Sequence, residues 1–199
     1  MPDYIRWSAA ATLAIAAVVT VDAATVSRQS AEAFAQKVTV IRRNAEAGTP
    51  APRKTPVSQD ELNSWFTYSA TPHLPGGVSQ PQITIVGGGR VAGQAIVDLD
   101  ALAKRRSSGG TFDPWSLVGG KVPVNVTGIL HTRDGKARFE VHGAEISGLP
   151  VSPTLLQELV SIYSRTPEDP QGVRIDDTFP LPAQIREIQV GQGQAVVVQ

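Results

Sequence analysis

The clearest alternation of apolar and polar residues lies between positions 122 and 147. Asp134-Gly135 in the middle of this stretch is a preferred two-residue type I′ turn. If the chain turns there, nearly all apolar side chains fall on one surface, as a sheet with one buried face requires. We therefore predict a β-hairpin with these opposed pairs: Arg133 with Lys136, Leu130 with Phe139, Gly128 with Val141, and Val126 with Gly143.

The same register gives the polar surface of the hairpin. His131 pairs with Arg138, and His142 pairs with Thr127. The two histidines are then offset along the strands by about 13 Å at ~3.3 Å per residue. A zinc ion needs its ligands at about 2 Å, so they cannot share one. His73 lies in a proline-flanked loop, and we predict no metal site.

Three segments show the apolar periodicity of helices. Residues 25–46 carry one thin apolar stripe. Ser58 and Glu61 have the spacing of a capping box, which predicts a helix from there to about Ser69. Ser152 and Pro153 are typical of a helix start, and the apolar face that follows extends to Tyr163.

The remaining apolar runs alternate with period two and predict strands at Gln82–Val86, Val91–Leu99, Ile185–Val190 and Ala195–Val198. This order of elements indicates an α+β fold, with a long N-terminal helix and a strongly curved antiparallel sheet packed by two or three helices. We divide the chain into a leader at 1–24, a helix at 25–46, a proline-rich linker at 47–57 and an α+β domain at 58–199. A docking peptide is the alternative interpretation of the linker.

Residues 1–24 are typical of an export segment. Met1 to Arg6 is followed by an uncharged run, Trp7–Val21, and then by the small-x-small spacing of Val21-Asp22-Ala23. About 15 residues in a helix reach ~22 Å, short of the ~30 Å hydrocarbon core, which favours a signal peptide over a spanning helix. Both remain open. We expect an exported protein, either periplasmic or tethered to the membrane by residues 7–24.

The composition of the chain argues against some classes of function. The chain has 199 residues, with 18 Lys and Arg balanced by 18 Asp and Glu, so no net field attracts nucleic acid. Aromatic residues make up 6%, which argues against a base-stacking surface. The chain has no Cys, so no disulfide holds the exported part together.

No catalytic motif stands out. Gly87, Gly89 and Gly93 approach the spacing of a dinucleotide fingerprint, but a period-two pattern follows them where that motif needs a helix. We interpret them as a hairpin turn. Glu168-Asp169 and Asp176-Asp177 match no calcium loop and form a solvated acidic rim. We expect no cofactor and no enzyme, with an unrecognised hydrolase as the alternative.

The apolar surface of the hairpin is the candidate binding site. Glycines in it leave space opposite the helix at 153–163, where a groove for an apolar ligand would fit; ordinary helix-on-sheet packing is the more common interpretation of such a surface. The candidate residues are Val122, Val124, Val126, Gly128, Leu130, Phe139, Val141, Gly143, Leu155, Leu159 and Ile162.

A succession of short motifs completes the picture. They are V-S-x-x-E-L-N (57–63), G-x-V-x-G (89–93), V-D-L-D-A-L (97–102), G-x-V-P-V (120–124) and I-S-G-L-P-V-S-P-x-L-L (146–156). In their order the chain resembles uncharacterised bacterial exported or membrane-tethered proteins, and in shape the tubular lipid-binding class. The resemblance implies a non-catalytic envelope protein that binds a lipid or other apolar ligand between helix and sheet. The alternative is an interaction module that contacts an envelope partner through its linker or sheet edge.

Overall fold

The computed structural model describes residues 26–70, 72, 74, 76–101, 120–164 and 170–199, with only the backbone at 159 and 162–164. The predicted leader at 1–24, His73 and the Glu168-Asp169 pair lie outside these residues. Among the helices that are described, none has both the length and the apolar character needed to cross a membrane.

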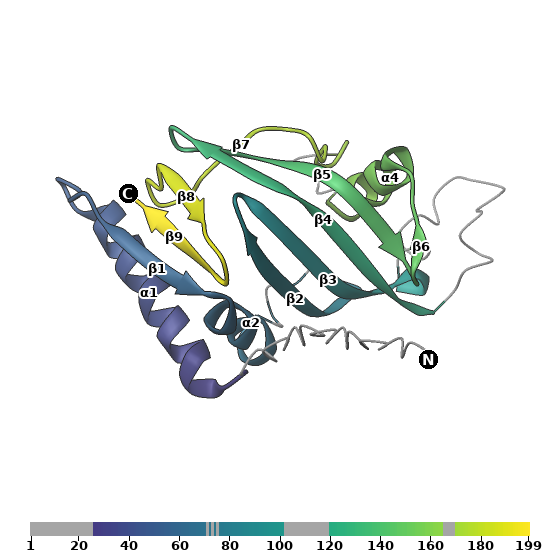
Figure 1. The fold of residues 1–199 in the computed structure, drawn as a ribbon, viewed down its shortest axis with the longest axis horizontal. Helices are drawn as coiled ribbons and strands as arrows, with labels where there is room; N and C mark the ends of the chain where they lie inside the picture. The colour runs from purple at the N-terminus through teal and green to yellow at the C-terminus, as the bar shows by residue number, and fades with distance from the viewer. Residues whose placement is uncertain (1–25, 71, 73, 75, 102–119, 165–169) are drawn as a thin grey trace, which may run out of the picture.

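The fold is α+β, as predicted, but its strands form two antiparallel sheets instead of one (Figure 1). The larger sheet is open, with strand order β2-β3-β4-β5-β6 and with β7 beside β5; the smaller has the order β1-β9-β8. The helices are α1 (Arg28–Glu46), α2 (Gln59–Tyr68) and α4 (Pro153–Ser164). The strands are β1 (Lys54–Ser58), β2 (Val78–Gly87), β3 (Arg90–Asp98), β4 (Lys121–Arg133), β5 (Lys136–Ile146), β6 (Leu149–Pro150), β7 (Phe179–Pro180), β8 (Glu187–Val190) and β9 (Gln194–Val198).

The second half of the predicted linker is a strand. β1 pairs with β9 along its whole length, from Lys54 opposite Val198 to Ser58 opposite Gln194. Thr55 and Val57 point inward and are buried, while Pro56 between them is exposed. β1 is an edge strand, where a proline without an N–H is tolerated. The prolines led us to interpret this segment as a linker, although its side chains alternate as in a strand. Residues 54–58 belong to the folded unit.

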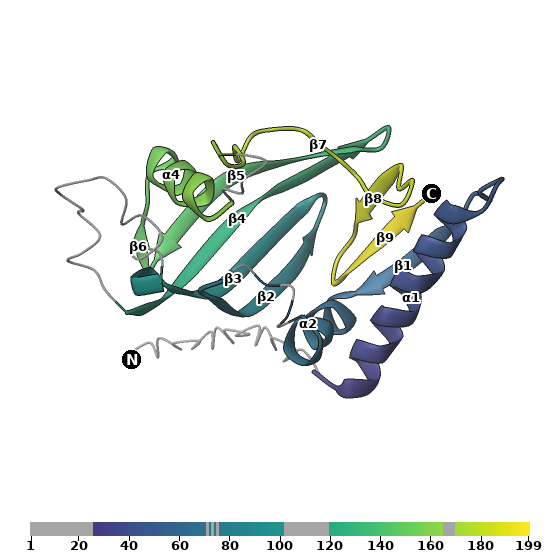
Figure 2. The ribbon, with the colours of Figure 1, turned by 180° about the vertical axis from the view of Figure 1, so that it is seen from behind.

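Helices α1 and α2 pack against each other beside the smaller sheet (Figure 2). The rings of Phe34 and Trp65 lie 5.5 Å apart, and Lys37 forms an ion pair with Glu61 at 2.6 Å. The predicted capping box is present, because Glu61 accepts from the Ser58 amide while its own amide donates to the Ser58 hydroxyl. One carboxylate thus caps α2 and ties it to α1.

The polar face of α2 covers the free edge of β2. Asn63, which is 6% exposed, accepts from the Ile83 amide at 2.8 Å and donates to the Ile83 carbonyl at 2.9 Å. One helical turn earlier, the Gln59 side chain accepts from the Ile85 amide at 2.8 Å. Side chains four apart on a helix match main-chain groups two apart on a strand. The two carboxamides therefore satisfy an edge that would otherwise be open to another strand.

The β4–β5 hairpin follows the predicted register from its turn as far as Gly128 opposite Val141. A β-bulge at His142 then shifts the pairing, so that Thr127 faces Gly143 and Val126 faces Ala144. The predicted pairs of Val126 with Gly143 and of His142 with Thr127 are therefore wrong. The extra residue turns Ala144 and Ile146 to the apolar face, and both are buried there.

The apolar face of the larger sheet is covered only in part. Leu99, Val122 and Ile146 form its buried core, and Val124 packs against them. Leu156 on α4 is 5% exposed, and α4 contacts β5. Farther along, Val126, Leu130, Phe139 and Val141 are half-buried. The core is therefore concentrated at one end of the sheet.

Candidate functional site

The predicted groove residues that belong to the sheet share one of its faces. Val122, Val124, Val126, Leu130, Phe139 and Val141 lie on the apolar side of β4 and β5. From α4, Leu155 is half-buried, while the side chains at 159 and 162 lie outside what the structure describes. The strands thus bring the sheet half of the predicted site together.

The two glycines predicted to open the groove do not do so. A Cβ atom at Gly128 would lie 2.2 Å from the Glu140 carbonyl oxygen and 2.7 Å from the Phe139 ring. The ring of Phe139 therefore fills the space above Gly128. Gly143 pairs with Thr127, so the bulge places it on the polar face. These glycines serve close packing and the bulge, which corrects our interpretation.

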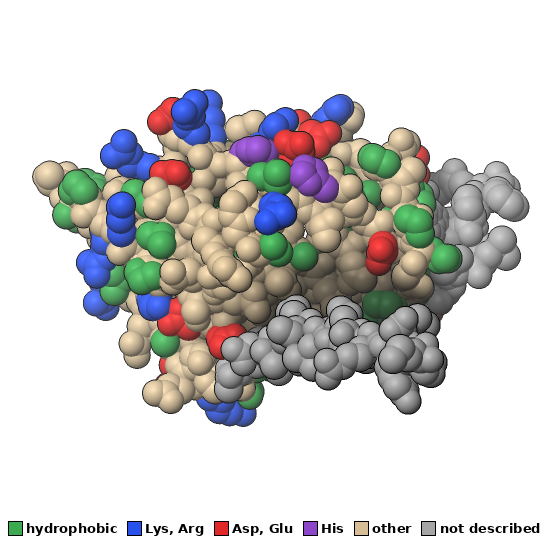
Figure 3. Space-filling model, viewed as in Figure 1, with side chains coloured by type: hydrophobic (Ala, Val, Ile, Leu, Met, Phe, Trp, Pro, Cys, Tyr) green, Lys and Arg blue, Asp and Glu red, His purple; other side chains and the backbone are tan. Residues whose placement is uncertain are grey.

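A single carboxylate, that of Glu140, connects the two histidines. Nε2 of His131 lies 2.9 Å from Oε2 of Glu140, and Nε2 of His142 lies 3.3 Å from Oε1 of the same carboxylate. Although His142 lies four residues along β5 from Arg138, the partner of His131, both imidazoles reach this carboxylate. Hydrogen bonds from His131 and His142 lower the pKa of Glu140. This cluster lies on the exposed polar face, where the two imidazoles are drawn in purple (Figure 3).

The imidazoles approach opposite oxygens of Glu140 instead of converging on one point. Across the described part of the chain, no group of three or more His, Cys, Asp or Glu residues is placed to hold a metal ion. Gly87, Gly88 and Gly89 have positive φ and form the turn between β2 and β3, as predicted. Asp177 of the acidic rim pairs with Arg174 at 3.7 Å.

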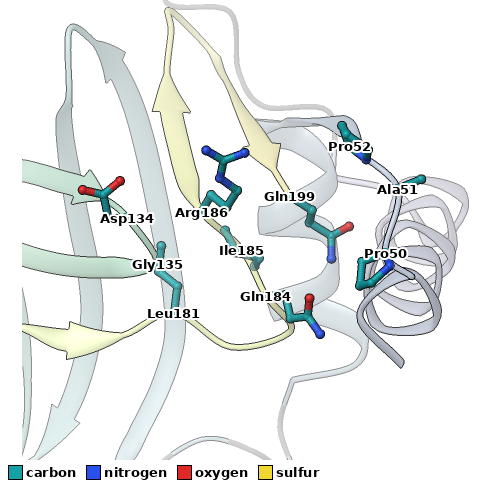
Figure 4. Close-up of a pocket in the computed structure, with 10 residues that line it drawn as sticks. All are labelled: Pro50, Ala51, Pro52, Asp134, Gly135, Leu181, Gln184, Ile185, Arg186 and Gln199. Atoms are coloured by element: carbon teal, nitrogen blue, oxygen red, sulfur yellow. The ribbon is translucent and has the colours of Figure 1, made fainter. Parts of the chain in front are cut away.

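A larger feature lies where the two sheets meet. A cleft of about 590 Å³ is bounded by the proline-rich segment, the tip of the β4–β5 hairpin and the chain before β8 (Figure 4). We call it the junction cleft. Its lining residues are Pro50, Ala51, Pro52, Asp134, Gly135, Leu181, Gln184, Ile185, Arg186 and Gln199.

Hydrogen bonds between distant segments hold the walls of the junction cleft. The buried Gln199 side chain donates to the carbonyls of Ile41 and Ala183 at 2.9 and 2.7 Å. Asn44 bonds both the amide and the carbonyl of Ala51, and Gln184 donates to the Ala45 carbonyl. At the opposite wall, the Gly135 amide donates to the Arg186 carbonyl, and the Leu181 amide to the Gly135 carbonyl. These hydrogen bonds join the segments that line the cleft to one another and to α1.

Side chains of opposite charge stand at the margin of this cleft. Asp134 and Arg186 are both exposed, and within the described part of the chain neither has an ion-pair partner. The rest of the lining is mostly apolar and includes Leu181, Ile185 and Pro50. An apolar floor with charges at the rim can bind a ligand that has both kinds of group.

Sequence reasoning missed the junction cleft because its walls come from three separated segments. Each had a signal of its own: the prolines at 50 and 52, the Asp134-Gly135 turn, and the prolines at 180 and 182. No local pattern shows that these segments meet, since the pairing of β1 with β9 brings them together.

Comparison of the chain with protein-family models, with curated proteins and with solved structures found no match.

Proposed function

We propose that this protein is a non-catalytic interaction module that binds an extended segment of a partner protein in the junction cleft. The observation that supports this most directly is a cleft of about 590 Å³ whose walls are fixed by hydrogen bonds between distant segments. Ligand sites in proteins typically have volumes of about 300–1,000 Å³ and are largely formed in advance. A rigid site also loses less entropy on binding.

The chemistry of the cleft fits a peptide better than a lipid chain. An acyl chain has no polar groups and gains free energy only where it leaves water. The junction cleft is open and has Asp134 and Arg186 at its margin. A peptide can place an apolar side chain against Leu181 and Ile185 while its polar groups meet the two charges. This corresponds to the interaction-module alternative, with the proline-rich segment as one wall.

Peptide selection tests this proposal. The full chain is immobilised and used to select from a random linear peptide library. The affinities of enriched peptides are then measured for the wild type, for Ala51→Trp and for Ala47→Trp. Ala51 lines the cleft with an exposed side chain, whereas the equally exposed Ala47 lies outside it. The indole at position 51 occupies the cleft, and the matched control leaves it open.

We expect the enriched peptides to share an apolar residue next to charged residues. Ala51→Trp should weaken their binding about tenfold or more, since loss of a central contact costs roughly 2 kcal/mol. Ala47→Trp should bind them as the wild type does. Enrichment of no common pattern, or equal binding to both variants, contradicts the proposal.

The half-buried apolar face of the larger sheet favours a second candidate, a lipid or other apolar ligand between α4 and the sheet. Val126, Leu130 and Val141 remain partly exposed there. Native mass spectrometry of the chain purified from cells tests this candidate. A bound mass in the lipid range that Ala51→Trp retains supports it, and a ligand-free spectrum argues against it.

A further inference from the structure

The polar face of the β4–β5 hairpin holds a second hollow, independent of the junction cleft. It has a volume of about 460 Å³ and is lined by His131, Arg133, Lys136, Arg138 and Thr178, together with Thr132 and Ala137. No acidic residue lines it. We call it the basic hollow.

The basic side chains of the basic hollow face one another across the strands. Arg133 lies directly opposite Lys136, and His131 directly opposite Arg138. Directly opposed side chains in an antiparallel pair have Cβ atoms about 4.5–5.5 Å apart, and like charges there destabilise the sheet. The Arg133–Lys136 pair therefore works against the stability of this exposed hairpin. An anion bound between them removes that penalty.

The two pairs differ in whether an acidic residue contacts them. Glu140 contacts His131, His142 and Arg138, and hydrogen bonds from the two histidines lower the pKa of this carboxylate. Arg133 and Lys136 form no ion pair with any residue that the structure describes. Nearby Asp134 lines the junction cleft instead. Two positive charges therefore remain uncompensated.

We propose that the basic hollow binds the phosphate group of a small soluble molecule. A phosphate monoester carries a charge of about −1.5 to −2 at pH 7, which matches the two uncompensated cations. Arginine donates to phosphate through a planar fork and lysine acts as a point charge, so Arg133 and Lys136 supply complementary contacts. The hydroxyl of Thr178 adds a donor at the margin. A hollow receives a small anion, whereas a membrane surface meets protruding cations.

The test measures thermal stability and binding on the full chain. Inorganic phosphate and glycerol 3-phosphate are the probes, with sodium chloride at equal ionic strength and glycerol as references. The variants are Lys136→Glu, which removes the like-charged pair, and Lys121→Gln. Lys121 is an exposed lysine on the same strand as Arg133, outside the basic hollow.

We expect both phosphates to raise the Tm of the wild type and of Lys121→Gln above that in chloride. Lys136→Glu should bind glycerol 3-phosphate about tenfold or more weakly, because it loses one charged contact and gains a repulsive one. Without ligand, Lys136→Glu should be at least as stable as the wild type, since the repulsion from Arg133 is gone. A variant that merely misfolds would instead have a lower Tm.

Three results would overturn the proposal. One is a wild-type Tm that phosphate raises no more than chloride. Another is an equal loss of binding in Lys121→Gln. The third is a response to phosphatidylglycerol vesicles without any response to soluble phosphates, which would assign the surface to a membrane.

Discussion

Replacing Asn63 by leucine removes the two hydrogen bonds that this side chain makes to the edge of β2. The Asn63 side chain accepts from the amide of Ile83 and donates to its carbonyl, at 2.8 and 2.9 Å. Leucine has the same number and branching of side-chain heavy atoms as asparagine but cannot form hydrogen bonds. Two main-chain groups then remain beneath α2 without a partner, and water reaches them poorly because Asn63 is 6% exposed.

The loss of stability can be estimated from the unpaired amide and carbonyl of Ile83. Each buried group left without a partner costs about 1–3 kcal/mol, and the apolar gain of leucine offsets roughly 1–2 kcal/mol of the total. We expect Asn63→Leu to lower the free energy of unfolding by about 2–4 kcal/mol. In a domain of this size that corresponds to a Tm lower by roughly 4–16 °C.

Urea unfolding followed by circular dichroism measures this difference. Asn125→Leu is the matched control, since Asn125 lies half-buried on the polar face of β4 and its side chain bonds no described residue. We expect the control to change stability by less than about 1 kcal/mol. If Asn63→Leu and the control lose the same amount, the carboxamide does not hold the edge and the reasoning fails.

Two further predictions concern single side chains. Gly128→Ala should lower the free energy of unfolding by about 3 kcal/mol or more, because its Cβ would lie 2.2 Å from the Glu140 carbonyl oxygen. Gly143→Ala should lower it by less than about 1 kcal/mol, because its Cβ would lie 3.3 Å from the Thr127 hydroxyl. Chemical unfolding of the two variants measures both values. Partial burial alone would raise the pKa of Glu61, but bonds from Lys37 and Ser58 lower it below its ordinary value of 4.5. The stability that Glu61 contributes is therefore present above pH 4.5 and lost as the pH falls through the lower folded pKa. Glu61→Gln should destabilise the protein by about 1–2 kcal/mol at pH 7 and converge with the wild type in acid, measured by unfolding across pH; a constant difference at all pH values contradicts this.

The elements that could be predicted are those with local causes. The capping box at Ser58 and the turn at Asp134-Gly135 depend on residues within a few positions of each other, and the structure confirms both. The bulge also left a trace in the sequence. Apolar residues on β5 change from odd positions, Phe139 and Val141, to even positions, Ala144 and Ile146. Such a change of phase is what an extra residue produces.

The smaller sheet, the junction cleft and the basic hollow could not be predicted from local patterns. β1 meets β9 from far along the chain, and nothing within residues 54–58 specifies that partner. The prediction that Gly128 leaves space on the apolar face was wrong for a related reason. A glycine in a strand leaves space only if no neighbouring ring occupies it, and Phe139 occupies the space at Gly128.

The extra residue at His142 has a consequence for how β5 can change in length. Loss of one residue from a regular strand inverts every later side chain relative to its partner. Here Val141 already faces Gly128 and Gly143 already faces Thr127. Excision of the imidazole-bearing residue between them yields an unbroken ladder in which each remaining side chain keeps its orientation. At this point of β5, evolution can therefore delete one codon without moving the apolar side chains of the strand to the polar face of the sheet.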